Sequence, residues 1–226
     1  MDNIWELCQK QTMVSPGHLT FLKNIIDGVN HDHIDGDIVE CGVWKGGCSM
    51  WMAYCQKQHN MKRNILLYDT FEGMTYPSSD KDAVEARETF DKIANNLCRR
   101  DYDLWHDTNK WAYAPIELVK SNMLLVGYDQ NRVSLVKGDV LETLDAKPPK
   151  SISIVRLDTD WYDSTKKEFD VLFPLVSIGG YIIVDDYWAW KGAKDATDEF
   201  LIENGHNVVK LDPNFTGNIL VLKKIS

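Results

Sequence analysis

Short apolar runs alternate along the chain with longer amphipathic segments. The runs are rich in β-branched residues and mostly do not alternate with polar ones, as is typical of parallel strands buried on both faces. They cover residues 37–41, 64–68, 133–136, 152–156 and 181–184. Helical patterns occur at 16–29, 49–58, 115–126 and 164–173. This βαβ order predicts an open α/β sheet with helices between its strands.

The C-terminal end has a different pattern. Two apolar runs, 207–211 and 218–222, are separated by a turn that contains Pro213, Asn214 and Gly217. A connection rich in turn residues allows neighbouring strands to run antiparallel. We therefore predict an antiparallel hairpin that closes the sheet.

Residues 75–114 interrupt the alternation of strands and helices. The segment is long and charged, and Tyr102, Trp105, Trp111 and Tyr113 lie close together in it. A connection of this length is usually functional or disordered. We interpret it as a partly helical lid insertion, with a merely structural insertion as the alternative.

Composition bounds the class of protein. The chain has 226 residues, 44% of them hydrophobic, and no Gly/Ser/Pro-rich linker divides it, which suits a single domain over 1–226. A net charge of −9 argues against nucleic acid as a partner, because phosphate contacts require clustered Lys and Arg. The sequence contains neither the apolar run of a signal peptide nor the roughly 20 apolar residues of a membrane helix. Five cysteines without a C-x-x-C motif favour reduced thiols, so we expect a cytoplasmic protein that does not bind membranes.

In an open parallel sheet ligands bind beyond the carboxyl ends of the strands, so the residues after each run are candidates. After the first run, glycines allow a tight turn and close approach to a ligand, and the N–H groups of the following helix can face a carboxylate. The candidates here are Glu40, Cys41, Gly42, Gly46, Gly47 and Ser49. The spacing is not G-x-G-x-x-G, which argues against a nicotinamide or flavin dinucleotide. It resembles the E/D-x-G-x-x-x-G loop of class I S-adenosylmethionine (SAM) methyltransferases; a turn without a ligand is the alternative.

The next two strand ends suggest a nucleoside. Asp69 follows the second run and can accept hydrogen bonds from both ribose hydroxyls, although an acid here can also cap a helix. Residues after the third run fall where SAM enzymes contact adenine, and loop capping explains them nearly as well. The candidate contacts at these two ends are Asp69, Thr70, Phe71, Gly138, Asp139 and Val140.

Acidic residues gather after the fourth and fifth runs. Asp158 and Asp160 follow one run, and Asp185 and Asp186 follow the other. Carboxylates at one sheet edge repel one another unless a counter-ion is present, and hard oxygen ligands suit Mg²⁺. We therefore assign Asp158, Asp185 and Asp186 as Mg²⁺ ligands, with solvated acids as the alternative.

This cluster indicates how a methyl group would be transferred to oxygen. A substrate alkoxide must attack the sulfonium methyl group, and a divalent cation lowers the pKa of the hydroxyl and orients its oxygen. A neighbouring carboxylate then takes the proton. Asp160 is the preferred base, and Asp158 could serve as both ligand and base.

With these motifs identified, the chain resembles the macrocin O-methyltransferase family, whose members methylate deoxysugar hydroxyls of natural products. The resemblance runs through 12–15, 39–47, 69–73, 156–164, Pro174, Gly179, Gly180 and 184–187. It implies a class I methyltransferase (Rossmann-like) fold with a mostly parallel seven-stranded sheet, helices on both faces and an N-terminal helical arm over 1–30. It implies SAM and Mg²⁺ as cofactors, and it brings Met13, Val14 and Ser15 near the SAM.

The sequence departs from the family pattern on the acceptor side. Thr159 stands where the family commonly has Gly, and Trp161 stands where it has a small residue or Met. Aromatic faces suit sugar rings, phenols and flat heterocycles, but tryptophans are also ordinary core material. The candidate substrate contacts are Trp161, Tyr162, Tyr187, Trp188 and His106.

Together these features predict a SAM- and Mg²⁺-dependent O-methyltransferase. Its acceptor would be a small molecule, a sugar of a glycosylated natural product or of a polysaccharide. A catechol or phenol acceptor, and a SAM-binding module without catalysis, are the alternatives. We also expect a homo-oligomer, because the arm and the lid of relatives often pack against a neighbouring copy.

Overall fold

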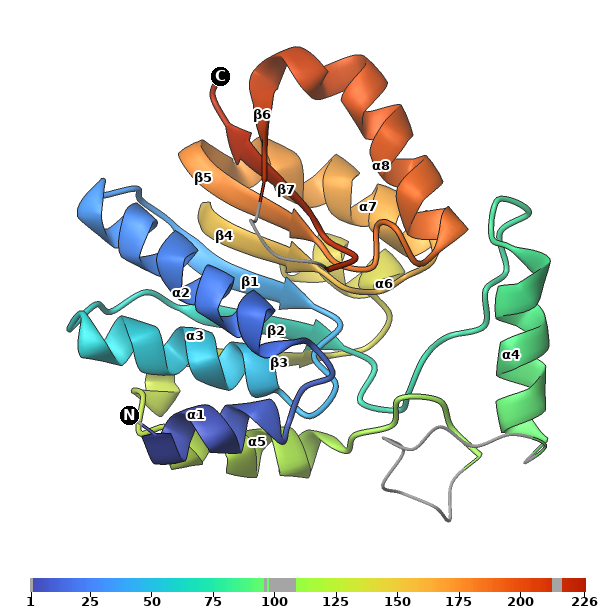
Figure 1. Ribbon diagram of the computed structural model, residues 1–226, viewed down its shortest axis with the longest axis horizontal. Coiled ribbons are helices and arrows are strands. Elements are labelled where there is room, and N and C mark those ends of the chain that lie inside the picture. The colour runs from blue at the N-terminus through green and yellow to red at the C-terminus, as the bar shows by residue number, and fades with distance from the viewer. Residues whose placement is uncertain (1, 96, 98–108, 213–216) are drawn as a thin grey trace.

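The computed structural model describes residues 2–95, 97, 109–212 and 217–226 (Figure 1). Within these residues the centre of the molecule is a seven-stranded sheet of order β3-β2-β1-β4-β5-β7-β6. The strands are β1 (Asp37–Cys41), β2 (Ile65–Asp69), β3 (Val133–Lys137), β4 (Ile152–Leu157), β5 (Val176–Val184), β6 (Val208–Leu211) and β7 (Leu220–Lys224). The first five run parallel, whereas β7 is antiparallel to both β5 and β6. The predicted α/β sheet and its C-terminal antiparallel hairpin are confirmed.

Helices cover both faces of the sheet (Figure 1). They are α1 (Asp2–Gln9), α2 (Pro16–His31), α3 (Gly47–Gln58), α4 (Val84–Ala94), α5 (Ile116–Leu125), α6 (Val140–Ala146), α7 (Tyr162–Leu172) and α8 (Lys191–Asn204). Short 3-10 turns lie at Gln130–Arg132, Phe173–Leu175 and Gly205–Asn207. None of the described helices combines the length and the apolar character needed to cross a bilayer.

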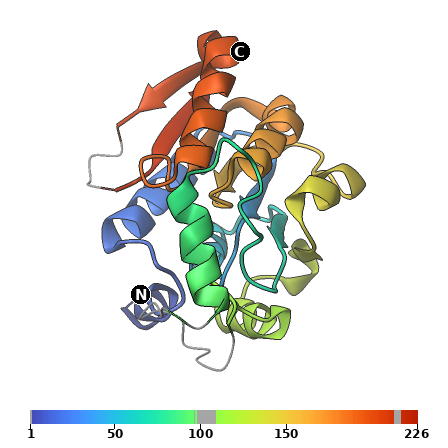
Figure 2. The same cartoon turned by 90° about the vertical axis from the view of Figure 1, so that its right-hand side faces the viewer.

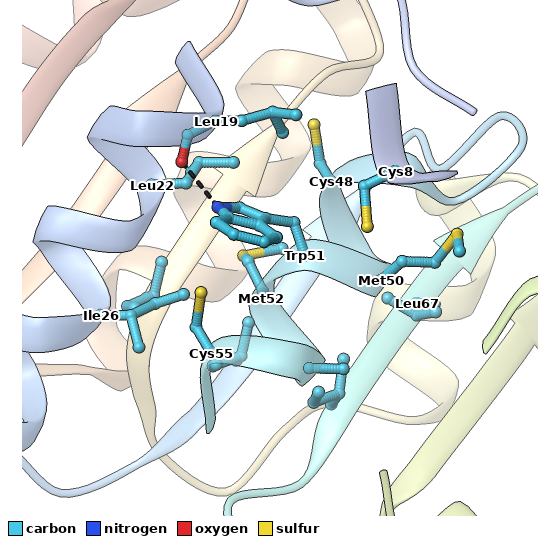
Figure 3. Packing of buried hydrophobic residues seen from close by; sticks show 14 of the residues in the cluster. Cys8, Leu19, Leu22, Ile26, Cys48, Met50, Trp51, Met52, Cys55 and Leu67 are labelled. Carbon is cyan, nitrogen blue, oxygen red and sulfur yellow. Dashed lines mark hydrogen bonds between the residues drawn. The ribbon is translucent and has the colours of Figure 1, made fainter. Parts of the chain in front are cut away.

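Two hydrophobic cores lie on opposite sides of the sheet. Ile38 and Ile154 pack into the core formed with α1, α2, α3 and α5, whereas Val39 and Val155 pack into the core with α6, α7 and α8. Successive residues of a strand point to opposite faces, so each apolar run supplies both cores. Figure 3 shows part of the first core, where the indole N–H of Trp51 donates to the Leu19 carbonyl at 2.7 Å.

The described cysteines, Cys8, Cys41, Cys48 and Cys55, are buried free thiols, as expected. Burial raises the pKa of Cys48 to about 12, so this thiol is protonated at neutral pH.

The described residues of the segment 75–114 lie beyond the carboxyl ends of the strands, where α4 stands apart from the sheet (Figures 1 and 2). The described part of this segment is therefore partly helical. Its action as a lid stays a prediction, and Tyr102, Trp105 and His106 lie outside the described residues.

Candidate active site

Two adjoining cavities lie at the carboxyl edge of the parallel strands. The larger has a volume of about 380 Å³ and the smaller of about 220 Å³. Five residues border both cavities: Met13, Trp44, Asp158, Asp186 and Asn218. The position agrees with the rule that ligands bind beyond the carboxyl ends of an open parallel sheet.

The larger cavity extends from the ends of β2 and β3 towards α7 and α8. Eight predicted cofactor contacts line it: Met13, Gly42, Asp69, Thr70, Gly138, Asp139, Val140 and Asp158. Asp139 also caps α6, because its Oδ1 accepts a hydrogen bond from the N–H of Leu141 at 2.9 Å. Asp139 therefore caps a helix, as the alternative interpretation predicted, and it also lines the cavity.

Asp69 joins the first two strand-end loops. Its Oδ2 accepts from the N–H groups of Val43 at 2.6 Å and Trp44 at 3.0 Å. Its Oδ1 accepts from the N–H of Phe71 at 2.6 Å. Burial raises the pKa of Asp69, while these N–H donors favour the ionised form. The hydroxyl of Thr70 also donates to Oδ1, at 3.4 Å, so four protein donors surround this carboxylate, about as many as it can accept.

The glycines of the first loop approach other parts of the chain closely. Gly42 has a φ of 80°, and a Cβ placed on it would lie 1.9 Å from the carbonyl oxygen of Asp158. A Cβ on Gly47 would lie 2.6 Å from the carbonyl oxygen of Cys8, so the N-terminal arm can pack this closely only because residue 47 has no side chain. A Cβ on either glycine would thus meet protein backbone, and close approach of Gly42 to a ligand stays a prediction. Some predicted cofactor contacts line neither described cavity: Cys41, Gly46, Gly47, Ser49 and Phe71.

The smaller cavity lies between the arm and the end of β1. Met13, Val14 and Ser15 line it together with Glu40. Ser15 also begins α2, because its hydroxyl accepts from the N–H of His18 at 3.3 Å. Sequence reasoning did not single out His18, which is buried and lines this cavity.

A buried arginine lies against this acid-rich wall. Arg156 donates from Nη1 to Glu40 Oε1 at 2.8 Å and to Asp158 Oδ2 at 2.7 Å, and from Nη2 to Asp185 Oδ2. The other oxygen of Glu40 accepts from the hydroxyl of Ser49. Both Glu40 oxygens are thus engaged within the protein. No role was assigned to Arg156 from the sequence, although an arginine within a mostly apolar strand run was a visible signal.

Three of the four predicted acids meet in one place. One carboxylate oxygen from each of Asp158, Asp160 and Asp186 lies within 4.8 Å of the others, a group that could hold a metal ion. Burial raises the pKa of Asp158 to about 7 and that of Asp160 well above its ordinary value. Among the described residues, Asp160 Oδ1 has no hydrogen-bond partner. Asp160 and Asp186 have φ values of 68° and 50°, a strained backbone that persists only where the surroundings impose it.

The observed group differs from the predicted ligand set by one residue. Asp185 is paired with Arg156, and its Oδ1 accepts from the N–H of Asp186 at 3.0 Å. It therefore lies beside the group and outside it. Asp160, which was predicted as the base, is the third member of the observed group in place of Asp185.

Three tryptophans close the larger cavity. Trp111, Trp161 and Trp190 come from three segments and pack edge to face, with ring centroids 5.4–5.8 Å apart. The indole N–H of Trp161 donates to the Thr75 carbonyl at 2.9 Å, which ties the start of the 75–114 segment to this cluster. Sequence reasoning placed Trp111 in the lid but did not foresee this contact.

Three other predicted substrate residues lie away from both cavities. The hydroxyl of Tyr162 donates to Glu199 at 2.6 Å, and the hydroxyl of Tyr187 donates to Asp198 at 2.5 Å. Trp188 is 63% exposed. These three residues line neither described cavity, so Trp161 is the described substrate candidate that does.

This strand order, with acidic residues at the ends of β1 and β2 and cavities beyond them, defines a class I SAM-dependent methyltransferase. The family model described as macrocin-O-methyltransferase (TylF) matches residues 8–212. The chain therefore belongs to the macrocin-O-methyltransferase family, and it is an O-methyltransferase, as predicted.

Individual relatives agree with this assignment. The chain is 32% identical over 190 residues, 84% of its length and 67% of the relative's, to 8-demethyl-8-(2,3-dimethoxy-alpha-L-rhamnosyl)-tetracenomycin-C 4'-O-methyltransferase of Streptomyces olivaceus. It is 25% identical over 206 residues to mycinamicin III 3''-O-methyltransferase of Micromonospora griseorubida, covering 89% of this chain and 75% of that protein. The solved structure of the O-methyltransferase NovP superimposes with a TM-score of 0.79 at 25% identity, covering 96% of this chain and 83% of NovP.

Proposed function

We propose that this enzyme methylates a hydroxyl of a sugar ring on a small glycosylated molecule, with Mg²⁺ bound at the acid cluster. The acid cluster at the edge of the larger cavity is the observation that carries the proposal. The relatives named for a rhamnosyl tetracenomycin and for mycinamicin III support a glycosylated acceptor. A sugar ring with neighbouring hydroxyls offers two oxygens that can reach one cation.

The donor set fits Mg²⁺. The cluster presents carboxylate oxygens, the ligands that hard divalent cations prefer, and their repulsion is relieved by a positive charge. Asp158 and Asp186 of this cluster are assigned as ligands, and Asp185, which lies beside the cluster next to Asp186 and is paired with Arg156 in the metal-free protein, is assigned as the third. Bound Mg²⁺ would act as a Lewis acid that lowers the pKa of the acceptor hydroxyl.

Asp160 is the proposed general base. Its Oδ1 has no partner among the described residues, and burial raises the pKa of Asp160, which makes its ionised carboxylate a stronger proton acceptor. As the hydroxyl proton moves to Asp160, the acceptor oxygen bonds to the methyl carbon and the carbon–sulfur bond breaks. The products are the methyl ether and S-adenosylhomocysteine (SAH).

The cofactor would lie across the ends of the first strands. Asp69 is proposed to hold the ribose, Gly138 and Val140 to contact the adenine, and Met13 to lie near the methionine end. All four residues line the larger cavity, which supports this orientation.

Methyl transfer from SAM to a panel of acceptors tests the proposal. The panel holds TDP-rhamnose, rhamnosyl glycosides and catechol, each assayed with Mg²⁺ and with EDTA. We expect transfer to a sugar hydroxyl that EDTA abolishes. Methylation of catechol alone, or transfer that persists in EDTA, would contradict it.

Two variants separate the base from the ligands. Asp160→Asn should abolish turnover and leave Mn²⁺ affinity, measured by calorimetry, close to wild type. Asp185→Asn should weaken Mn²⁺ binding. The exposed Asp163, substituted by Asn, is the matched control. Equal loss of Mn²⁺ affinity in Asp160→Asn would instead make Asp160 a ligand.

A further inference from the structure

The buried side chain of Arg156 lies among the carboxylates at the carboxyl edge of the sheet. Arg156 is 3% exposed, and in the sheet it is the register partner of Glu40 on β1 and of Ile183 on β5. Asp158 follows Arg156 by two residues, and Asp185 follows Ile183 by two residues. The register of three neighbouring strands therefore surrounds one guanidinium with carboxylates.

The guanidinium connects both parts of the site. Its partners are Glu40 on the cofactor side and Asp158 and Asp185 on the metal side. An arginine side chain stays charged in a folded protein, so these three contacts are ion pairs. A charged arginine thus lies where buried carboxylates would otherwise repel one another.

We propose that Arg156 is the counter-ion of Asp158 and Asp185 in the metal-free protein, and that a divalent cation bound at the acid cluster takes these two carboxylates over from it. The inference rests on the proposed metal site. Arg156 is a positioning residue, because it holds these two carboxylates in place before the metal binds. Its ion pair with Glu40 remains when the two carboxylates are released. Because the guanidinium and the metal carry like charge, Arg156 stabilises the metal-free fold and weakens metal binding.

The Arg156→Gln variant tests this competition through metal affinity. Mn²⁺ binding is measured by calorimetry at one fixed pH for the wild type and all variants. We expect binding tighter than wild type by on the order of tenfold, since a neighbouring like charge is removed. The metal-free variant should unfold at a lower temperature, and saturating Mn²⁺ should raise its Tm by more than it raises that of the wild type.

Two further variants act as controls. Arg156→Lys keeps the charge, so its Mn²⁺ affinity should lie closer to wild type than that of Arg156→Gln. Arg63 is also buried, but it bonds Asn30 and the Gly36 carbonyl. Arg63→Gln should lower the Tm without changing Mn²⁺ affinity.

A folded Arg156→Gln protein that binds Mn²⁺ no more tightly than wild type would overturn the inference. Absence of Mn²⁺ binding by the wild type would instead defeat the proposed function. If Arg156→Gln does not fold, NMR of the wild type with ¹⁵N-labelled arginine tests whether metal binding changes the surroundings of Arg156. The Arg156 Nε–H signal, assigned by its loss in Arg156→Lys, should shift on Mg²⁺ saturation while that of Arg63 stays; an unshifted Arg156 signal would overturn the inference.

Discussion

Asp82 Oδ1 accepts a hydrogen bond at 2.9 Å from the backbone N–H of Tyr162, although 80 residues of sequence separate them. Tyr162 is the first residue of α7, so a side chain of the 75–114 segment caps the helix that follows the Asp158–Asp160 turn. A Cβ on Gly192, at the start of α8, would lie 2.0 Å from the same oxygen. The segment outside the sheet is thus anchored where the acidic turn ends.

We expect Asp82→Ala to lower the free energy of unfolding by about 1–2 kcal/mol, because the N–H of Tyr162 loses its cap in a buried position. Urea unfolding measures this, and amide exchange at Tyr162 should accelerate. Asp80 is exposed, so Asp80→Ala is the control and should leave both quantities unchanged. Slow exchange at Tyr162 in Asp82→Ala would show that the cap is not needed.

The tryptophan cluster should be a main source of stability at the cavity wall. Trp161 is 4% exposed and packs on Trp111 and Trp190. Its replacement by Ala should lower the free energy of unfolding by about 3–5 kcal/mol, through lost burial and the cavity left behind. Trp188 is 63% exposed, and Trp188→Ala should cost far less. Equal midpoints for the two variants in urea would contradict this account.

Gly42 should be intolerant of any side chain. Its φ of 80° disfavours other residues, and a Cβ would meet the backbone of Asp158, which cannot move without moving the acidic turn. Gly42→Ala should therefore lower both the urea midpoint and SAH affinity measured by calorimetry. At Gly205, φ is −60° and a Cβ meets nothing within 4 Å, so Gly205→Ala should be neutral or stabilising by about 0.5 kcal/mol. Wild-type SAH affinity in Gly42→Ala would refute this expectation.

His18 should make the fold sensitive to acid. Burial, assisted by the charge of Arg156, lowers its pKa from 6.5 to about 3. Because the folded pKa lies below the unfolded one, protonation favours the unfolded chain. The contribution of His18 to stability is complete above pH 6.5 and is lost as the pH falls towards 3.

Urea unfolding between pH 7 and pH 4 measures this dependence. His18→Gln should lose stability less steeply than the wild type as the pH falls. His206 is exposed, so His206→Gln should keep the wild-type slope. Identical slopes for His18→Gln and the wild type would contradict the shift.

Much of the fold was readable from local patterns, and the exceptions have local causes. The run predicted at 181–184 is the end of β5, which begins at Val176, because Gly179 and Gly180 interrupt its apolar pattern. The bounds of helix α8 were not predicted. Its buried face is built largely of Ala193, Ala196 and other small residues, so its apolar stripe is weak in sequence.

The sequence by itself determined which residues reach the carboxyl edge, because strands end where apolar runs end. Asp69, Asp158 and Asp186 could therefore be named from spacing alone. Only the tertiary structure decided which side chains meet there. Strand register brings Arg156 beside Glu40, and the left-handed turn at Asp160 directs that residue to Asp158 and Asp186 while Asp185 turns to the arginine. Contacts between separate segments depend on register and turn geometry, which no single segment encodes.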